Sequence, residues 1–139
     1  MRGASPVRLV ISLYEQAIED LRRAVIAMDK GAIEVRTREI NHAIMVIAQL
    51  QGSLDMERGG EVARNLARFY GAVRAGLTEA QLKQSSILIE EQISQLAEVH
   101  EAWLVVERAT ATPQPVSAVS PASAPEISRS ATSGATWNA

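Results

Sequence analysis

Two histidines are the side chains best suited to chemistry in this 139-residue chain, which contains no cysteine. Glu39 and His42 form a Glu-x-x-His motif, a unit that occurs twice, with two further glutamates, in the di-iron sites of four-helix bundles. The second histidine, His100, has Ala97 at the position where a second motif needs glutamate. We therefore expect no metal site, and we predict that His100 is a hydrogen-bonded histidine at the margin of a hydrophobic core.

Other catalytic chemistry finds no support in the sequence. Without cysteine the chain cannot form a thiolate nucleophile, a disulfide or a zinc–thiolate site. The glycine pair Gly59-Gly60 lacks the spacing, and the lysine followed by serine or threonine, of a phosphate-binding loop. We therefore predict that the protein is not an enzyme, needs no cofactor and acts by binding another protein.

Composition and charge exclude several partners. The chain has 14 basic and 16 acidic residues, for a net charge of −2, which gives no basic surface for nucleic acid. No apolar run approaches the roughly 18 residues of a membrane span. The first residues include Arg2 and Arg8 but no sustained apolar core, so they do not read as a signal peptide. The sequence thus predicts a cytoplasmic protein.

The elements that must position any site are helices. Apolar residues recur at three- and four-residue steps, and no segment shows the period of two that is typical of a strand. Ser5 and Pro6 suit the N-cap and first position of a helix, and Gly31 can end that helix by adopting a positive φ. The pattern predicts an all-α fold, an antiparallel four-helix bundle over residues 1–108. The predicted core stripes lie in residues 10–28, 33–54, 62–80 and 89–106.

The composition changes after residue 108. Residues 109–139 are mostly Ala, Ser, Thr and Pro, and their only charged side chains are Glu126 and Arg129. Such a segment offers too little apolar surface to offset the entropy of ordering it, so we predict a disordered C-terminal tail. Its one aromatic residue, Trp137, is predicted to have no specific role; the alternative is that it folds back onto the partner-binding surface.

The two glycines before the third helix have a local interpretation. Gly59 can adopt a left-handed conformation without steric cost, and Gly60 can then be the N-cap, with Glu61 favoured by the helix dipole. Because Asp or Ser would cap better than Gly, a second interpretation is that Gly60 permits close packing of a neighbouring helix end.

The helices carry more apolar surface than one core needs. Consecutive apolar residues at 44–47, 87–89 and 104–106 cover more than half of a helix circumference. The surplus could be spare core, a homodimer contact or a groove for a partner helix.

Several stretches match a known family. Residues 13–17 read Leu-Tyr-Glu-Gln-Ala, where the family has Leu-Tyr-Asp-Gly-Ala. Residues 53–61 read Ser-Leu-Asp-Met-Glu-Arg-Gly-Gly-Glu and match Ser-Leu-Asp-x-Glu-x-Gly-Gly-Glu. Positions 41–50 fit Asn-x-Ala-x-x-Ile-Ile-x-x-Leu with Val46 at the first isoleucine, and Asn65, Leu66 and Tyr70 follow in register. Over residues 5–103 the chain resembles the flagellar secretion chaperone family, FliS.

The resemblance implies a cytoplasmic, non-enzymatic chaperone for flagellin. It would bind the disordered C-terminal region of flagellin, prevent premature polymerisation and present the client to components of the flagellar type III export gate. A homodimer is also open, and the alternative functions are a generic four-helix dimerisation or adaptor module and a metal-binding bundle enzyme. The predicted partner-binding residues are Tyr14, Asn41, Ile44, Ile47, Leu66, Phe69, Tyr70 and Val73.

Overall fold

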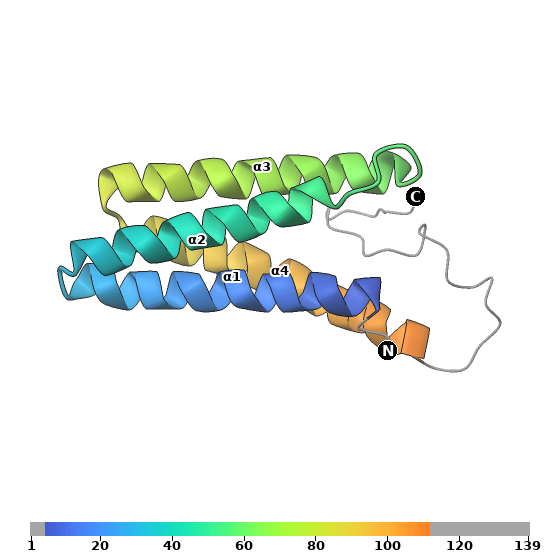
Figure 1. Cartoon of the computed structure of the whole chain (residues 1–139), viewed down its shortest axis with the longest axis horizontal. Helices are drawn as coiled ribbons and strands as arrows, with labels where there is room; N and C mark the ends of the chain where they lie inside the picture. Colours follow the sequence, from blue (N-terminus) through green and yellow to red (C-terminus); the bar gives the residue numbers. More distant parts are fainter. Residues whose placement is uncertain (1–4, 112–139) are drawn as a thin grey trace.

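The computed structural model describes residues 5–111, which form four α-helices (Figure 1). They are α1 (Pro6–Asp29), α2 (Ile33–Gly52), α3 (Gly60–Lys83) and α4 (Ser86–Ala111). Consecutive helices run in opposite directions, and the described part of the chain contains no strand. The predicted all-α antiparallel bundle is therefore confirmed.

The last helix extends past the predicted end of the bundle. α4 continues to Ala111, so residues 109–111 are helical, whereas the sequence placed them in the tail. The remainder of the predicted tail, including Trp137, lies outside the described residues.

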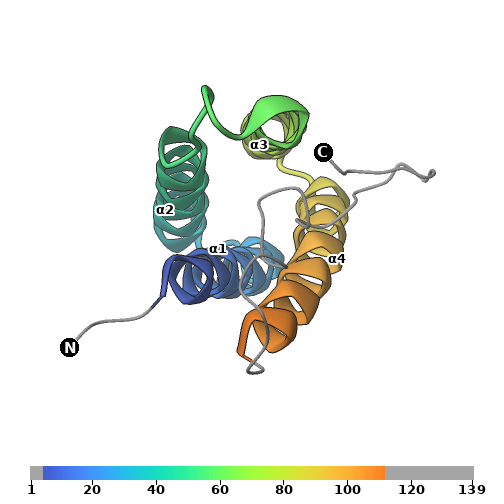
Figure 2. The same cartoon turned by 90° about the vertical axis from the view of Figure 1, so that its right-hand side faces the viewer.

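The helices are arranged as a square when the bundle is viewed end-on (Figure 2). α1 packs against α2 and α4, and α3 packs against the same two helices from the opposite corner. α1 and α3 are therefore diagonal partners. The core between the four helices is built from large aliphatic side chains and two tyrosines, the most buried of which are Ile11, Tyr14, Leu21, Ile40, Ile47, Leu50, Tyr70, Val73, Leu77, Ile89 and Leu96.

Both ends of α1 form as the sequence predicts. The Ser5 hydroxyl accepts a hydrogen bond from the Arg8 backbone N–H at 3.1 Å, and Pro6 occupies the first helical position. At the other end Gly31 has φ +72°, which lets the Ala32 N–H reach the Ala27 carbonyl at 2.8 Å. This bond pairs a carbonyl that a helix end would otherwise leave unsatisfied.

The glycine pair before α3 has the reverse of the predicted roles. Gly59 is the N-cap with φ −75°, and it is Gly60 that is left-handed, with φ +56°. A Cβ at Gly59 would lie 2.5 Å from the Ala63 Cβ and 2.7 Å from the Asp55 carbonyl oxygen. Gly59 is needed because its backbone N–H bonds that carbonyl at 2.8 Å, which draws the loop tightly against the first turn of α3.

The turn between α3 and α4 uses a residue other than glycine. Gln84 has φ 52° and ψ 50°, and this left-handed backbone lets the Ser85 N–H bond the Ala80 carbonyl at 3.0 Å. The Ser85 hydroxyl then caps α4 by accepting from the Leu88 N–H at 3.1 Å. A side chain in the left-handed region is strained, so the backbone conformation of Gln84 slightly lowers the stability of the fold.

Alanine substitutions should distinguish the glycines by their backbone conformation. Gly60→Ala is expected to lower the free energy of unfolding by about 1–2 kcal/mol, because an L side chain is strained at positive φ. Gly71→Ala should raise it by about 0.5–1 kcal/mol, because Gly71 lies inside α3 with open space at its Cβ. Urea unfolding measures both. Equal effects at the two positions would contradict the assigned conformations.

Replacing the strained glutamine should stabilise the fold. Gln84→Gly is expected to raise the free energy of unfolding by about 0.5 kcal/mol, because relief of the left-handed strain outweighs the greater entropy of glycine in the unfolded chain. Gln84→Ala, which keeps the Cβ, is the matched control and should not stabilise. Thermal unfolding of the two variants beside the parent chain checks this.

Candidate partner-binding surface

Two buried tyrosines from the diagonal helices meet at the centre of the bundle. Tyr14 of α1 and Tyr70 of α3 are 0% and 1% exposed, and their hydroxyl oxygens are 2.8 Å apart. The ring centroids are 6.1 Å apart and the rings are tilted by 60°. Both residues were predicted to contact a partner, but in this structure they form the core.

The environment keeps both phenols neutral. Burial, followed by the nearby Tyr70 and its hydrogen bond, raises the pKa of Tyr14 well above 10, while a hydrogen bond from the indole of Trp103 opposes this rise. Burial raises the pKa of Tyr70 to about 12, against the hydrogen bond from Tyr14, which lowers it. The pair can therefore act as hydrogen-bonding groups near neutral pH, and not as acids or bases.

The other predicted partner residues divide into core and surface. Ile47, Leu66 and Val73 are buried with the two tyrosines. Ile44 and Phe69 are partly buried against the core, and Asn41 is exposed. Of the predicted residues, only Ile44, Phe69 and Asn41 therefore reach the surface of the bundle.

The boundary between α2 and α3 is closed by polar bridges. The Gln81 side-chain N–H group donates to the Asn41 Oδ1 at 3.4 Å. Further along, Gln51 donates to the Ala67 carbonyl at 3.2 Å and accepts from Arg74 at 2.9 Å. A partner that docked along this boundary would have to displace these hydrogen bonds.

The boundary between α3 and α4 is tight at one end and loose at the other. Near the α3–α4 turn, a Cβ at Gly76 would lie 2.5 Å from the Gln92 Nε2, so the two helices are in close contact there. Farther along, α4 leaves α3 and tilts toward α1 (Figures 1 and 2). Among residues 86–110 of α4, Val99 is the last that is buried. Phe69, which lies one heptad before Gly76 on the same face of α3, borders the loose end.

We call the stretch 100–111 of α4 the end segment. Its apolar side chains Trp103, Leu104 and Val106 are only partly buried. Phe69 together with Trp103 and Val106 is the candidate partner-binding surface. Phe69 is among the residues predicted from the sequence to contact a partner, whereas Trp103 and Val106 are not. The apolar run at 104–106 is the sequence signal for this part of α4.

Two polar contacts attach the end segment to α1. The Arg8 guanidinium donates to the Glu107 carboxylate at 3.1 and 2.9 Å, and the His100 Nε2 lies 3.0 Å from the Glu15 carboxylate. The prediction that His100 is a hydrogen-bonded histidine at the core margin is thus confirmed. Such partly exposed pairs each contribute at most about 1 kcal/mol, and the packing of Trp103 against the core adds to the attachment of the end segment.

The two residues of the Glu-x-x-His motif bind other side chains and do not form a metal site together. His42 turns to α1, where its Nδ1 lies 2.5 Å from the carboxylate of Asp20, and Glu39 pairs with Arg23 at 3.3 Å. Asp20 is only 1% exposed and also accepts from Arg23 at 2.7 Å, so this network joins α1 to α2. Among residues 5–111, no three His, Asp or Glu side chains are grouped to hold a metal ion.

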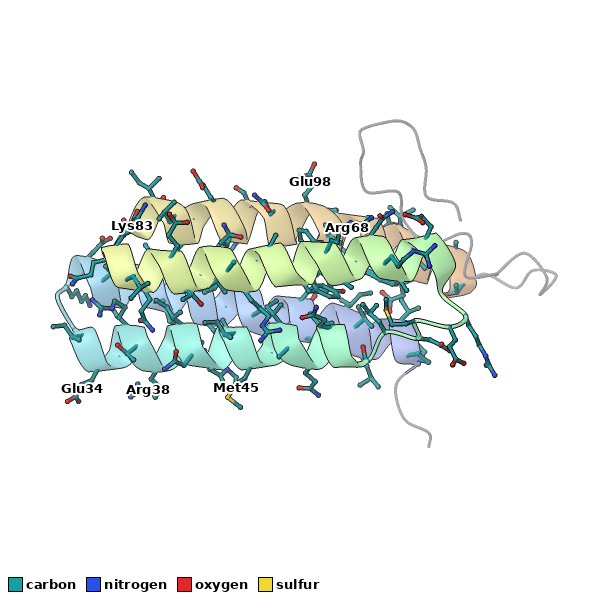
Figure 3. All side chains as sticks on the ribbon, turned by 90° about the horizontal axis from the view of Figure 1, so that it is seen from above. Glu34, Arg38, Met45, Arg68, Lys83 and Glu98 are labelled. Atoms are coloured by element: carbon teal, nitrogen blue, oxygen red, sulfur yellow. The ribbon has the colours of Figure 1, made fainter. Side chains whose placement is uncertain are left out.

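Part of the surplus apolar surface faces outward. Met45, Ile87 and Val105 are 66%, 68% and 56% exposed, so these members of the consecutive runs are not spare core. Met45 projects from α2 beside Glu34 and Arg38, on the side of the bundle opposite Glu98 of α4 (Figure 3). None of the helices in residues 5–111 combines the length and the apolar character required to cross a membrane.

Comparisons with known proteins give matches over most of the chain. A family model described as "Flagellar protein FliS" matches residues 1–110. The chain is 38% identical over 100 residues to the flagellar secretion chaperone FliSB of Pseudomonas aeruginosa, covering 72% of this chain and 79% of the relative. It is 34% identical over 102 residues to the flagellar secretion chaperone FliS of Salmonella typhimurium, covering 73% and 76%. For the flagellar secretion chaperone FliS of Vibrio cholerae the identity is 32% over 103 residues, covering 74% and 76%.

The two tyrosines are the only ones in the chain, so their ionisation can be followed directly. We expect the ultraviolet absorbance of tyrosinate to rise in the folded protein only near pH 12, whereas the urea-unfolded chain titrates near 10. Between these values the unfolded chain releases protons that the folded chain keeps, so stability falls as pH rises. The expected slope is about 1.4 kcal/mol per pH unit for each tyrosine. Tyrosinate appearing near pH 10 in folded protein would contradict the buried pair.

Proposed function

The chain belongs to the FliS family of flagellar secretion chaperones, and we propose that its client is flagellin, held in a form that cannot polymerise before export. The observation that carries this proposal is the family match over residues 1–110, nearly the whole described bundle. We further propose that the protein acts in the cytoplasm and hands its client to components of the flagellar type III export gate.

We propose that the C-terminal segment of flagellin packs on the apolar surface beside the end segment of α4. Phe69 and Trp103 would supply its largest contacts, because aromatic side chains bury much area at little entropic cost. Asn41 and Ile44 would form a second contact on α2. The buried members of the predicted set, Tyr14, Ile47, Leu66, Tyr70 and Val73, would shape this surface from within the core.

The energetics of such a complex favour a broad apolar contact. A disordered client loses conformational entropy when it is ordered, and that loss offsets part of the gain from each contact. Apolar burial along a helix can exceed this cost, and it gives the complex a negative heat-capacity change. No nucleotide is required by this scheme, since the export machinery can draw the client away.

The exposed apolar residues also bear on the oligomeric state. Met45, Ile87 and Val105 are exposed and could serve a homodimer, which the sequence left open. The proposed complex contains one chaperone chain and one flagellin chain. A mass measurement by light scattering on the free protein and on the complex decides between these stoichiometries.

Titration calorimetry with the C-terminal segment of flagellin from the same organism tests the proposal. We expect one-to-one binding with a negative heat-capacity change. Phe69→Ala should weaken binding about tenfold, as expected for an aromatic contact worth 1–2 kcal/mol. Ile26→Ala, which removes an exposed apolar side chain from α1, is the matched control and should bind as the parent chain does.

The absence of heat at tens of micromolar would count against flagellin as the client. If both variants lost affinity equally, the flagellin segment would not bind at the α3–α4 boundary.

A further inference from the structure

A buried arginine near the start of α2 has no partner within the described bundle. Arg36 is 9% exposed and lies four residues before Ile40, on the face of α2 that builds the core. Its Nε–H is shielded from solvent and makes no hydrogen bond, and no carboxylate of residues 5–111 pairs with its guanidinium group. The carboxylate of Glu39 binds Arg23 and Arg38 instead. Arginine is seldom buried to this extent without a paired group, so the position of Arg36 indicates a pairing group from outside.

The register of the helices places Arg36 at one end of the core, beside the two short turns. The contact of Asp20 with His42 aligns α1 with α2 and sets Arg36 level with the last turn of α1. The hydrogen bond between Gln81 and Asn41 aligns α3 with α2 and sets Arg36 level with the turn between α3 and α4. Both turns lie at the same end of the bundle (Figure 1).

The start of α2 adds unpaired donors at this end. Its N-cap is Ala32, which offers no side-chain acceptor, and the backbone N–H groups of Glu34 and Val35 find no acceptor within residues 5–111. The Glu34 carboxylate itself projects outward beside Arg38 (Figure 3). Because helical side chains lean toward the N-terminus of their helix, the guanidinium group of Arg36 approaches the same helix start. The positive end of the helix dipole and the buried cation therefore both favour an anion there.

Exposed apolar side chains accompany the cation. Ile33, the first residue of α2, is 61% exposed. Leu82 and Ile87, on the two sides of the turn between α3 and α4, are 79% and 68% exposed. A site for a free inorganic anion has no use for such side chains, whereas protein interfaces combine apolar area with arginine. We call Ile33, Arg36, Leu82 and Ile87 together the turn-end surface.

We propose that the turn-end surface binds an acidic segment of a second partner protein, in which an aspartate or glutamate carboxylate pairs with Arg36 between apolar neighbours. The fork of N–H donors on a guanidinium group matches the two oxygens of a carboxylate. The turn-end surface lies at the opposite end of the bundle from the end segment of α4 (Figure 1). The chaperone would therefore hold this partner and a client at the same time, and the inference does not depend on the identity of the client.

Nuclear magnetic resonance with a short peptide tests the proposal. The probe is Leu-Ala-Asp-Ala-Leu, blocked at both ends, and the control peptide carries asparagine in place of aspartate. We expect the backbone N–H signals of Glu34 and Val35 and the Nε–H signal of Arg36 to shift as the aspartate peptide is added. The dissociation constant should be on the order of 1 mM, as for a single small contact. The asparagine peptide should bind at least about tenfold more weakly, because a hydrogen bond to a charged group is lost.

Two arginine variants separate binding from structure. Arg36→Met keeps an apolar side chain of similar length and should abolish the difference between the two peptides. Its melting temperature should be unchanged or higher than that of the parent chain, because an unpaired buried charge has been removed. Arg38→Met, which removes an exposed arginine from the same helix, is the matched control and should keep the difference between the peptides.

Three results would overturn the proposal. One is equal binding of the two peptides to the parent chain, or no shift with either of them, and this comparison requires no variant. Another is a larger shift of the same signals with inorganic phosphate than with the aspartate peptide at equal concentration, which would identify a site for a free anion. The third is a lower melting temperature of Arg36→Met with unchanged peptide discrimination, as expected for a structural arginine. None of these measurements uses flagellin, so their failure would leave the proposed client unaffected.

Discussion

A hydrogen bond across the diagonal of the bundle constrains the rest of the fold. Tyr14 and Tyr70 come from helices that do not pack side by side, and their hydroxyls meet at 2.8 Å in the centre of the core. Separating them would leave two buried polar groups without partners, at about 1–3 kcal/mol each. A slide of α1 against α3 by one turn, about 5.4 Å, is therefore disfavoured. With the diagonal pair in register, α2 and α4 can only fill the two corners between them.

The corners are filled unequally, and the candidate surface follows from that. α2 is fixed to α1 by the buried Asp20 network and to α3 by hydrogen bonds from Gln51. α4 is fixed to α3 by the close contact of Gly76 with Gln92. Beyond Val99 it is held by partly exposed polar contacts to α1 and by the packing of Trp103 against the core. Apolar side chains on the end segment are therefore left half covered. The separation of the end segment from α3 therefore follows from the way the four helices pack.

Some features were predictable from sequence because they depend on few neighbours. The Ser5-Pro6 start of α1 and the positive φ of Gly31 are local, so residue type alone indicates them. The roles of Gly59 and Gly60 were reversed because they depend on where the loop returns against Ala63, which a sequence does not reveal. Much of the predicted partner set proved to be core for a related reason. Apolar periodicity marks the face of a helix that is buried, and it does not distinguish burial by the bundle from burial by a client.

An apolar client surface presents a physical conflict for a chaperone. A bundle with every polar group paired and every apolar side chain buried would gain no free energy from a partner. A widely exposed apolar face, in contrast, would associate with copies of itself. The bundle keeps most of its apolar side chains inside, and Phe69, Trp103 and Val106 are only partly buried. Under the proposed function, a client that orders on these side chains would complete their burial. The free protein exposes only part of each of them, which leaves too little apolar area for a stable contact with a second copy. Partial burial would then keep the free chaperone from associating with itself, and the area completed by the client would supply the affinity.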